Sequence, residues 1–222
     1  MGLPMYQPTN LAVLFDLDGT LLDSTGDLAD AANAARVALG LARLDDSQVE
    51  CHVGHGLLAL LEGAIPEVSP EERASAREHF IAHYETHLLV RSRPYPGVVS
   101  MFKGLRGRRL GLVTNKPSYF TLPILDRLGW SALFQAVVCG DTLPVRKPSP
   151  EPVLHGCALL GAPPSQTVFV GDTVVDQEAA LAAGCPFICV GWGRARLGTG
   201  HVVKALDELP AFISTHLEGG SR

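Results

Sequence analysis

The sequence lacks the features that mark several classes of protein. Basic residues are not in excess, since 18 Lys and Arg stand against 23 Asp and Glu, a net charge of −5. Nucleic-acid-binding domains normally carry a basic surplus or stripe, so we expect no nucleic-acid partner. No apolar run approaches the roughly 18 residues of a membrane span, so we expect no membrane partner. The first ten residues lack a basic stretch followed by an apolar one, which predicts no secretory signal.

Cysteine is also sparse and irregularly placed. The five cysteines are odd in number and contain no C-x-x-C pair. This argues against a disulfide framework or a zinc knuckle and favours a reducing, cytoplasmic location. Hydrophobic residues make up 46% of the chain, enough to bury a real core. The oligomeric state, monomer or homodimer, is left open.

Short apolar runs predict the strands of a parallel sheet. The clear runs are 11–15, 110–113, 168–170 and 187–190, and 136–139 is a weaker one. They are almost wholly apolar rather than alternating, as expected of strands that are covered on both faces. From residue 110 onward they alternate with helix-like stretches at 119–128, 151–160 and 176–183, a pattern of repeated βαβ units.

The segment 24–93 contains no good strand and reads as helical throughout. Ser69 with Pro70 and Glu72 has the spacing of a capping box, and so does Ser47 with Glu50. We therefore predict an α/β fold: a Rossmann-like parallel-sheet core, residues 1–23 and 94–222, with an inserted helical cap, residues 24–93.

Two aspartates follow the first apolar run directly, in the string Asp16-Leu17-Asp18-Gly19-Thr20. Ligands of open α/β sheets bind outside the carboxyl ends of the strands, so both aspartates reach the edge where chemistry is expected. Two carboxylates this close repel one another unless a cation neutralises them, and hard oxygen ligands suit Mg²⁺. An ordinary Asp-Gly turn after a strand is the alternative.

Further polar residues follow the other predicted strands. Thr114 and Asn115 follow the run 110–113, Lys147 follows the run 136–139, and Asp172 and Asp176 follow the run 168–170. Each is a weak signal alone, because a strand end is often only a turn. Their shared edge with Asp16 and Asp18 makes the set specific.

With these residues the sequence resembles the haloacid dehalogenase superfamily of hydrolases, and within it the phosphoglycolate phosphatases. The superfamily's four motifs match the Asp16–Thr20 string, Thr114, Lys147 and the 171–176 segment. The resemblance to the subgroup rests on Gly54-His55-Gly56-Leu57, Tyr95-Pro96-Gly97-Val98, Thr114-Asn115-Lys116-Pro117 and Gly140-Asp141-Thr142-Leu143-Pro144. It covers the chain from about residue 11 to residue 193.

The resemblance implies a role for each matched residue. Asp16 is expected to attack phosphorus, and Asp18 to act as general acid and then base. Mg²⁺ is expected on Asp16, Asp172 and the backbone carbonyl of Asp18. Thr114, Asn115 and Lys147 are expected to contact the substrate, with Lys147 also keeping Asp16 ionised. Asp176 is expected to orient Lys147 or a metal-bound water.

A few further residues are candidates to contact the leaving group of the substrate. In the Gly54-His55-Gly56 turn the glycines let the backbone approach closely, and His55 offers a donor to a substrate carboxylate. Contacts of Arg91, Arg93 or Trp192 with the substrate are left open.

The expected function is Mg²⁺-dependent hydrolysis of a small phosphorylated metabolite, 2-phosphoglycolate first, through an aspartyl-phosphate. The alternatives are a phosphatase for another sugar phosphate, an amino-sugar phosphate or a nucleotide, and a phosphoglucomutase-like phosphotransferase. A dehalogenase or a silent regulatory subunit is disfavoured, because Asp18 and the other motif residues are all present.

Overall fold

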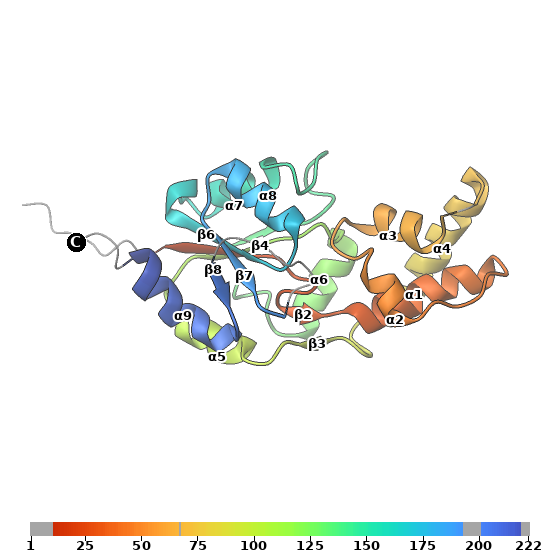
Figure 1. The fold of residues 1–222 in the computed structure, drawn as a ribbon, viewed down its shortest axis with the longest axis horizontal. Coiled ribbons are helices and arrows are strands. Elements are labelled where there is room, and N and C mark those ends of the chain that lie inside the picture. Colours follow the sequence, from red (N-terminus) through yellow and green to blue (C-terminus); the bar gives the residue numbers. More distant parts are fainter. Residues whose placement is uncertain (1–10, 67, 193–200, 219–222) are drawn as a thin grey trace, which may run out of the picture.

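The protein is built on a six-stranded parallel sheet (Figure 1). The computed structural model describes residues 11–66, 68–192 and 201–218. The strand order is β5-β4-β1-β6-β7-β8, and every neighbouring pair is parallel. The strands are β1 (Ala12–Phe15), β4 (Leu110–Val113), β5 (Ala136–Val138), β6 (Thr167–Gly171), β7 (Phe187–Val190) and β8 (His201–Val203). The predicted fold class is confirmed.

Helices cover both faces of the sheet, which explains why its strands β1 and β4 are apolar throughout. Along β1 the buried side chains alternate: Ala12 and Leu14 join one apolar cluster, Val13 and Phe15 the other. The first cluster includes residues of α7 (Glu151–Leu159) and α8 (Val174–Ala183). The second includes residues of α5 (Val98–Gly104), α6 (Ser118–Arg127) and α9 (Leu209–Phe212), and it continues into the helices of segment 24–93.

Four helices form within the segment 24–93 and gather at one end of the molecule (Figure 1). They are α1 (Thr25–Ala38), α2 (Asp46–Glu50), α3 (Leu57–Ala64) and α4 (Pro70–Thr86). The chain leaves and returns through a two-stranded antiparallel pair, β2 (Leu22–Asp23) with β3 (Arg93–Pro94). The two strands of this pair meet close to where the sequence predicts the limits of a cap.

The helix starts in this segment test the two predicted capping boxes. Ser69 caps α4 as predicted: its hydroxyl accepts the backbone N–H of Glu72 at 3.2 Å. The predicted cap at Ser47 is wrong, because α2 begins earlier, after Asp45, whose backbone N–H donates to Gln48 at 2.9 Å. Asp and Ser are equally good caps, so the local sequence cannot choose between two overlapping boxes.

Several short elements were not predicted from the sequence. They are β2, β3 and β8, helix α5, the 3₁₀ turn Pro164–Gln166 and the π-helical turn Ile213–Glu218. Each is too short to show a periodic pattern. Within residues 11–66, 68–192 and 201–218, no helix combines the length and the apolarity that crossing a membrane requires.

Candidate active site

The sheet order places the polar strand ends side by side. Strand β1 lies between β4 and β6, so Asp16 at the end of β1 has Thr114 on one side and Asp172 on the other. The backbone N–H of Asp16 donates to Val170 of β6 at 3.0 Å, which fixes the depth at which its side chain leaves the sheet. Strand β1 is also where the chain switches direction across the sheet, the usual place for a ligand in such folds.

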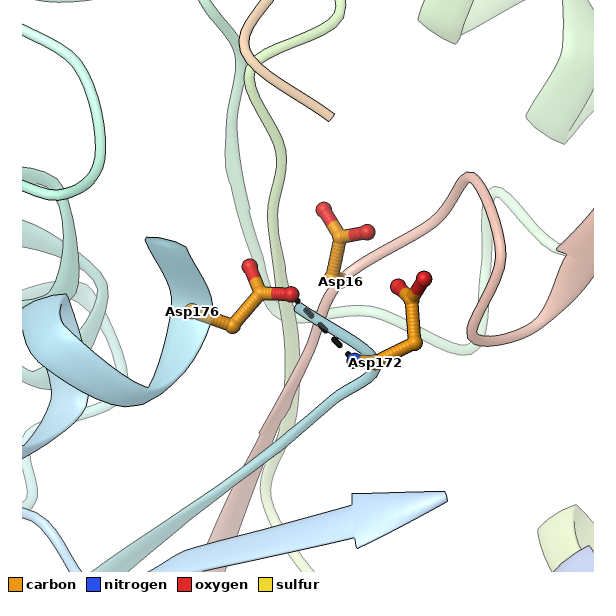
Figure 2. Close-up of side chains that lie close together, drawn as sticks. All are labelled: Asp16, Asp172 and Asp176. Atoms are coloured by element: carbon orange, nitrogen blue, oxygen red, sulfur yellow. Dashed lines mark hydrogen bonds between the residues drawn. The ribbon is translucent and has the colours of Figure 1, made fainter. Parts of the chain in front are cut away.

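Three carboxylates converge at this edge. Figure 2 shows Asp16, Asp172 and Asp176 side by side, from the ends of β1 and β6 and the first turn of α8. One oxygen of each lies within 4.8 Å of the others, and all three residues are buried. Burial raises the pKa of Asp16 to about 7; Lys147 opposes this shift, while Asp176 and Asp172 add to it.

Lys147 is the counter-charge of this cluster. Its Nζ donates to Asp16 at 2.7 Å, to Asp176 at 2.6 Å and to the backbone carbonyl of Val113 at 2.7 Å. Burial lowers the pKa of Lys147, but Asp16 and Asp176 more than offset this, so the net pKa lies above its usual value. An ammonium has three N–H donors, and all three point at protein oxygens.

Asp176 connects Lys147 to the start of α8. One of its oxygens accepts from Lys147, and the other accepts the Thr173 hydroxyl at 2.6 Å and the Thr173 and Asp172 backbone N–H groups at 3.0 and 3.2 Å. The close approach requires Gly171, because a Cβ there would lie 2.8 Å from the Asp176 carboxyl carbon. Asp176 thus contacts Lys147, and its role in orienting Lys147 or a metal-bound water stays a prediction.

Asn115 holds the backbone that carries Lys147. Its side-chain oxygen accepts the Lys147 backbone N–H at 3.0 Å, and its nitrogen donates to the Lys147 carbonyl at 2.9 Å and the Gly54 carbonyl at 3.1 Å. Asn115 therefore links two segments around the site. Its contact with a substrate stays a prediction, as does that of Thr114, whose hydroxyl accepts the Lys116 backbone N–H at 3.2 Å.

Asp18 is not part of the carboxylate cluster, which among the described residues consists of Asp16, Asp172 and Asp176. It accepts the Ser24 hydroxyl at 2.6 Å and the ammonium of Lys116 at 3.0 and 3.1 Å. The same ammonium donates to the hydroxyl of Tyr84 at 2.8 Å. Sequence reasoning missed Lys116 and Tyr84; the signal for Lys116 was the Thr114–Pro117 string that it shares with the resembled subgroup.

A cavity lies between the end of the sheet and the helices of segment 24–93. It encloses about 440 Å³ that protein atoms leave empty, including space open to solvent. The sheet edge contributes polar residues and α1, α3 and α4 contribute apolar ones. The lining residues are Asp16, Asp18, Thr114, Asn115, Lys116, Pro117 and Phe120 from the core, and Leu28, Val53, Gly54, Gly56, Leu57, Leu60 and Phe80 from segment 24–93.

The other residues singled out in the sequence lie elsewhere. His55 is exposed, and the lining of the cavity includes both glycines of its turn but not His55 itself. Arg91 pairs with Asp30 and Asp46 of α1 and α2. Arg93 donates to nearby backbone carbonyls, and Trp192 packs on Tyr95, 5.2 Å between ring centroids. A role for His55 in binding the substrate remains a prediction.

The carboxylate cluster has the chemistry of a site for a hard cation. Its donors are all oxygens, and the hydroxyl of Thr20 orients Asp172 by donating to it at 2.9 Å. Three carboxylates and one ammonium sum to a charge of −2, which a divalent cation would balance. Such an oxygen-only set can hold a metal ion.

Comparison with known proteins agrees with this doubly wound fold. A family model described as haloacid dehalogenase-like hydrolase matches residues 13–190. The chain belongs to this family, and the predicted resemblance is confirmed.

Individual relatives cover almost the whole chain. A phosphoglycolate phosphatase of Chromobacterium violaceum is 43% identical over 211 residues, 89% of this chain and 94% of the relative. An N-acetylmuramic acid 6-phosphate phosphatase of Pseudomonas aeruginosa is 38% identical over 82% of each chain. The crystal structure of a predicted phosphoglycolate phosphatase from Haemophilus somnus matches with a TM-score of 0.87 and 30% identity, covering 92% of this chain and 98% of that one.

Proposed function

We propose that the protein hydrolyses small phosphate monoesters, with 2-phosphoglycolate as its substrate and glycolate and inorganic phosphate as products. The observation that carries this proposal is the setting of Asp16. Its carboxylate lies at the end of β1, 2.7 Å from the ammonium of Lys147, and it lines the same cavity as Asp18. The phosphoglycolate phosphatases among the relatives support the choice of substrate.

The residues support a reaction in two steps. In the first, a carboxylate oxygen of Asp16 attacks phosphorus while protonated Asp18 gives its proton to the leaving oxygen, and the bond between phosphorus and that oxygen breaks. In the second, the Asp18 carboxylate takes a proton from a water whose oxygen attacks phosphorus. The bond to Asp16 breaks, inorganic phosphate leaves, and both aspartates return to their starting states.

Lys147 and Asp176 serve Asp16 in this scheme. The Lys147 ammonium keeps a buried carboxylate charged that burial alone would favour in its neutral form. Mg²⁺ is the proposed ion, held by Asp16, Asp172 and the Asp18 carbonyl, and when bound it neutralises phosphate charge that would repel the Asp16 carboxylate.

We further propose that residues 24–93 act as a cap over a core formed by residues 1–23 and 94–222. The support is the cavity, whose lining comes from both parts. A cap in this place excludes water while the phosphorylated Asp16 exists. All five cysteines are free thiols, which supports a reducing cytoplasmic location.

A phosphate-release assay tests the substrate. The panel is 2-phosphoglycolate, N-acetylmuramic acid 6-phosphate, glucose 1-phosphate and AMP, each with Mg²⁺ and after chelation. We expect the highest kcat/KM for 2-phosphoglycolate and no turnover without metal. Preference for the amino-sugar phosphate would assign the second relative's substrate instead, and conversion of glucose 1-phosphate without phosphate release would indicate a phosphotransferase.

The nucleophile is tested with Asp16→Asn against the matched exposed control Asp126→Asn on α6. We expect Asp16→Asn to lose turnover while its circular dichroism spectrum stays native, because an amide cannot attack phosphorus as a carboxylate does. The control should keep wild-type rates. Substantial phosphate release by verified Asp16→Asn protein would refute the covalent mechanism.

A further inference from the structure

The cavity holds one cation that the phosphoryl chemistry does not use. Among the described residues that line it, Lys116 alone carries a positive charge. Its side chain is 4% exposed, and it follows β4 by three residues. Lys147 already serves Asp16 and Asp176 with all three of its donors. Lys116 is a second buried ammonium in the same site, and none of the proposed phosphoryl-transfer steps uses it.

Lys116 is held from both sides of the cavity. From the core, Asp18 accepts at 3.0 and 3.1 Å; from α4, the Tyr84 hydroxyl accepts at 2.8 Å. Tyr84 is 1% exposed, and its ring forms a T-shaped pair with the ring of Phe120 on α6, with 4.7 Å between the ring centroids. Burial lowers the pKa of Lys116, but Asp18 and Tyr84 raise it by more than burial lowers it. The net pKa lies above its usual value, so the ammonium stays charged.

The Lys116 ammonium lies close to where a carboxylate on the leaving group of 2-phosphoglycolate would be. Asp18 is the residue that meets the ester oxygen in the proposed mechanism, and Lys116 lies directly against the Asp18 carboxylate. In 2-phosphoglycolate a single methylene separates the ester oxygen from the carboxylate. The protein groups that meet these two ends must therefore lie side by side, as Asp18 and Lys116 do.

We propose that Lys116 is a specificity-determining residue that binds a carboxylate on the leaving group, and that Tyr84 is the positioning residue that aims it from the cap. This inference rests on the proposed phosphatase function and deepens it. The two N–H groups that Lys116 directs at Asp18 go to the two oxygens of one carboxylate. One of them can therefore turn to a substrate carboxylate while the other keeps Asp18 in place.

Other cations are less suited to this role. The guanidinium of Arg91 pairs with Asp30 and Asp46, and its side chain is 44% exposed. His55 is exposed and does not line the cavity. The substrates named for the relatives, 2-phosphoglycolate and N-acetylmuramic acid 6-phosphate, are both phosphate monoesters that also carry a carboxylate.

Steady-state kinetics with two matched substrates isolate this role. 2-Hydroxyethyl phosphate has the skeleton of 2-phosphoglycolate with a neutral hydroxymethyl group in place of the carboxylate. Loss of the Asp18 contact in Lys116→Met slows both substrates alike, whereas loss of the carboxylate contact affects 2-phosphoglycolate alone. We expect the ratio of kcat/KM between the two substrates to fall at least about tenfold, the size of a lost charge-assisted hydrogen bond.

Three further variants complete the design. Lys116→Arg keeps the charge and should restore part of the ratio. Tyr84→Phe removes only the hydroxyl that orients the ammonium, and we expect a fall of about two- to tenfold in the same ratio, chiefly through KM. Lys103→Met on the exposed face of α5 is the matched control and should leave both substrates unchanged.

Binding provides a readout that needs no turnover. Calorimetry in the Asp16→Asn background, with Mg²⁺ present, should show 2-phosphoglycolate binding at least about tenfold more weakly when Lys116 is also Met, and 2-hydroxyethyl phosphate binding equally to both proteins. Absence of hydrolysis by the wild type would overturn the proposed function, yet calorimetry would still decide the role of Lys116. An equal effect on both ligands, no binding of 2-phosphoglycolate, or a selective loss in His55→Ala but not in Lys116→Met would overturn this inference.

Discussion

The buried carboxylates should affect the free energy of unfolding in two opposite ways: their mutual repulsion lowers it, and their binding of Mg²⁺ raises it. Asp172→Asn separates these two effects. Asp172 is 0% exposed, and one of its oxygens lies within 4.8 Å of an oxygen of Asp16 and of Asp176. At that separation two unit charges repel by about 3.5 kcal/mol at an effective dielectric constant of 20. The substitution removes two such repulsions and keeps the acceptor for the Thr20 hydroxyl. Lost attraction to Lys147 offsets part of the gain.

We therefore expect the metal-free variant to be more stable than the metal-free wild type by about 1–2 kcal/mol, which raises Tm by about 2–8 °C in a chain of this size. Mg²⁺ should reverse the order. At one hundred times its Kd an ion stabilises the wild type by about 2.7 kcal/mol, whereas the variant, which lacks one ligand, should gain less than about 1 kcal/mol.

Differential scanning calorimetry at pH 8 measures both effects, with and without Mg²⁺ after exhaustive chelation. This pH lies above the pKa of about 7 that burial gives Asp16, so that carboxylate is ionised. Asp126→Asn on the exposed side of α6 is the matched control and should follow the wild type. A metal-free Asp172→Asn protein that melts below the wild type, or an equal Mg²⁺ shift in both, would refute the charge argument.

Three further predictions concern the C-terminal turn, one glycine and the thiols. Arg108 donates hydrogen bonds of 2.6 and 2.8 Å to the two carboxylate oxygens of Glu218, and these lower the pKa of Glu218. Glu218→Gln should therefore lower the free energy of unfolding by about 1–3 kcal/mol at pH 7. Denaturation curves should show this difference vanish as the pH falls through the lowered pKa. Gly56→Ala places a Cβ 3.2 Å from the Asn115 carbonyl oxygen, so it should lower both kcat/KM and Tm. Gly40 shares the positive φ, but a Cβ there contacts nothing, so Gly40→Ala should lower Tm alone. One cysteine is exposed and four are buried, so Ellman's reagent should titrate one thiol in the folded protein and five in denaturant.

The core strands were predictable because a strand that is buried on both faces needs apolar residues at almost every position, and such a run is easily recognised in the sequence. Strands such as β1 and β4 are short, wholly apolar and followed by polar residues, and nothing nearby competes with that interpretation. The strand order is different, because no local pattern states that β1 lies between β4 and β6. The meeting of Asp16 and Asp172 follows from that order. Sequence could place both on one edge but could not place them in contact.

Short and half-exposed elements escaped prediction for a different reason. Strand β8 has three residues, of which only Val203 is buried, so it carries almost no periodic signal. The β2–β3 pair is two residues long in each strand. Both owe their pairing to neighbours that are distant in sequence, and β propensity is weak without that context.

Lys116 was missed because its partners are remote. Asp18 lies 98 positions away, and Tyr84 lies 32 positions away in a segment that the sequence predicts only as helical. A lysine after a strand is usually solvated, and no local pattern indicates that this one is buried. Only the folded chain brings Tyr84 of α4 and Asp18 to Lys116, where they hold it as a buried cation.

The two buried lysines differ in what their partners allow. Lys147 directs its three N–H groups at three separate protein oxygens, all in the core, so any ligand would have to displace a contact that holds Asp16. Lys116 directs two N–H groups at a single carboxylate and the third at Tyr84 of α4. Lys147 is therefore suited to hold a nucleophile still. Lys116 is suited to exchange partners with a substrate, and because one of its contacts comes from α4, the direction of its ammonium depends on where α4 lies.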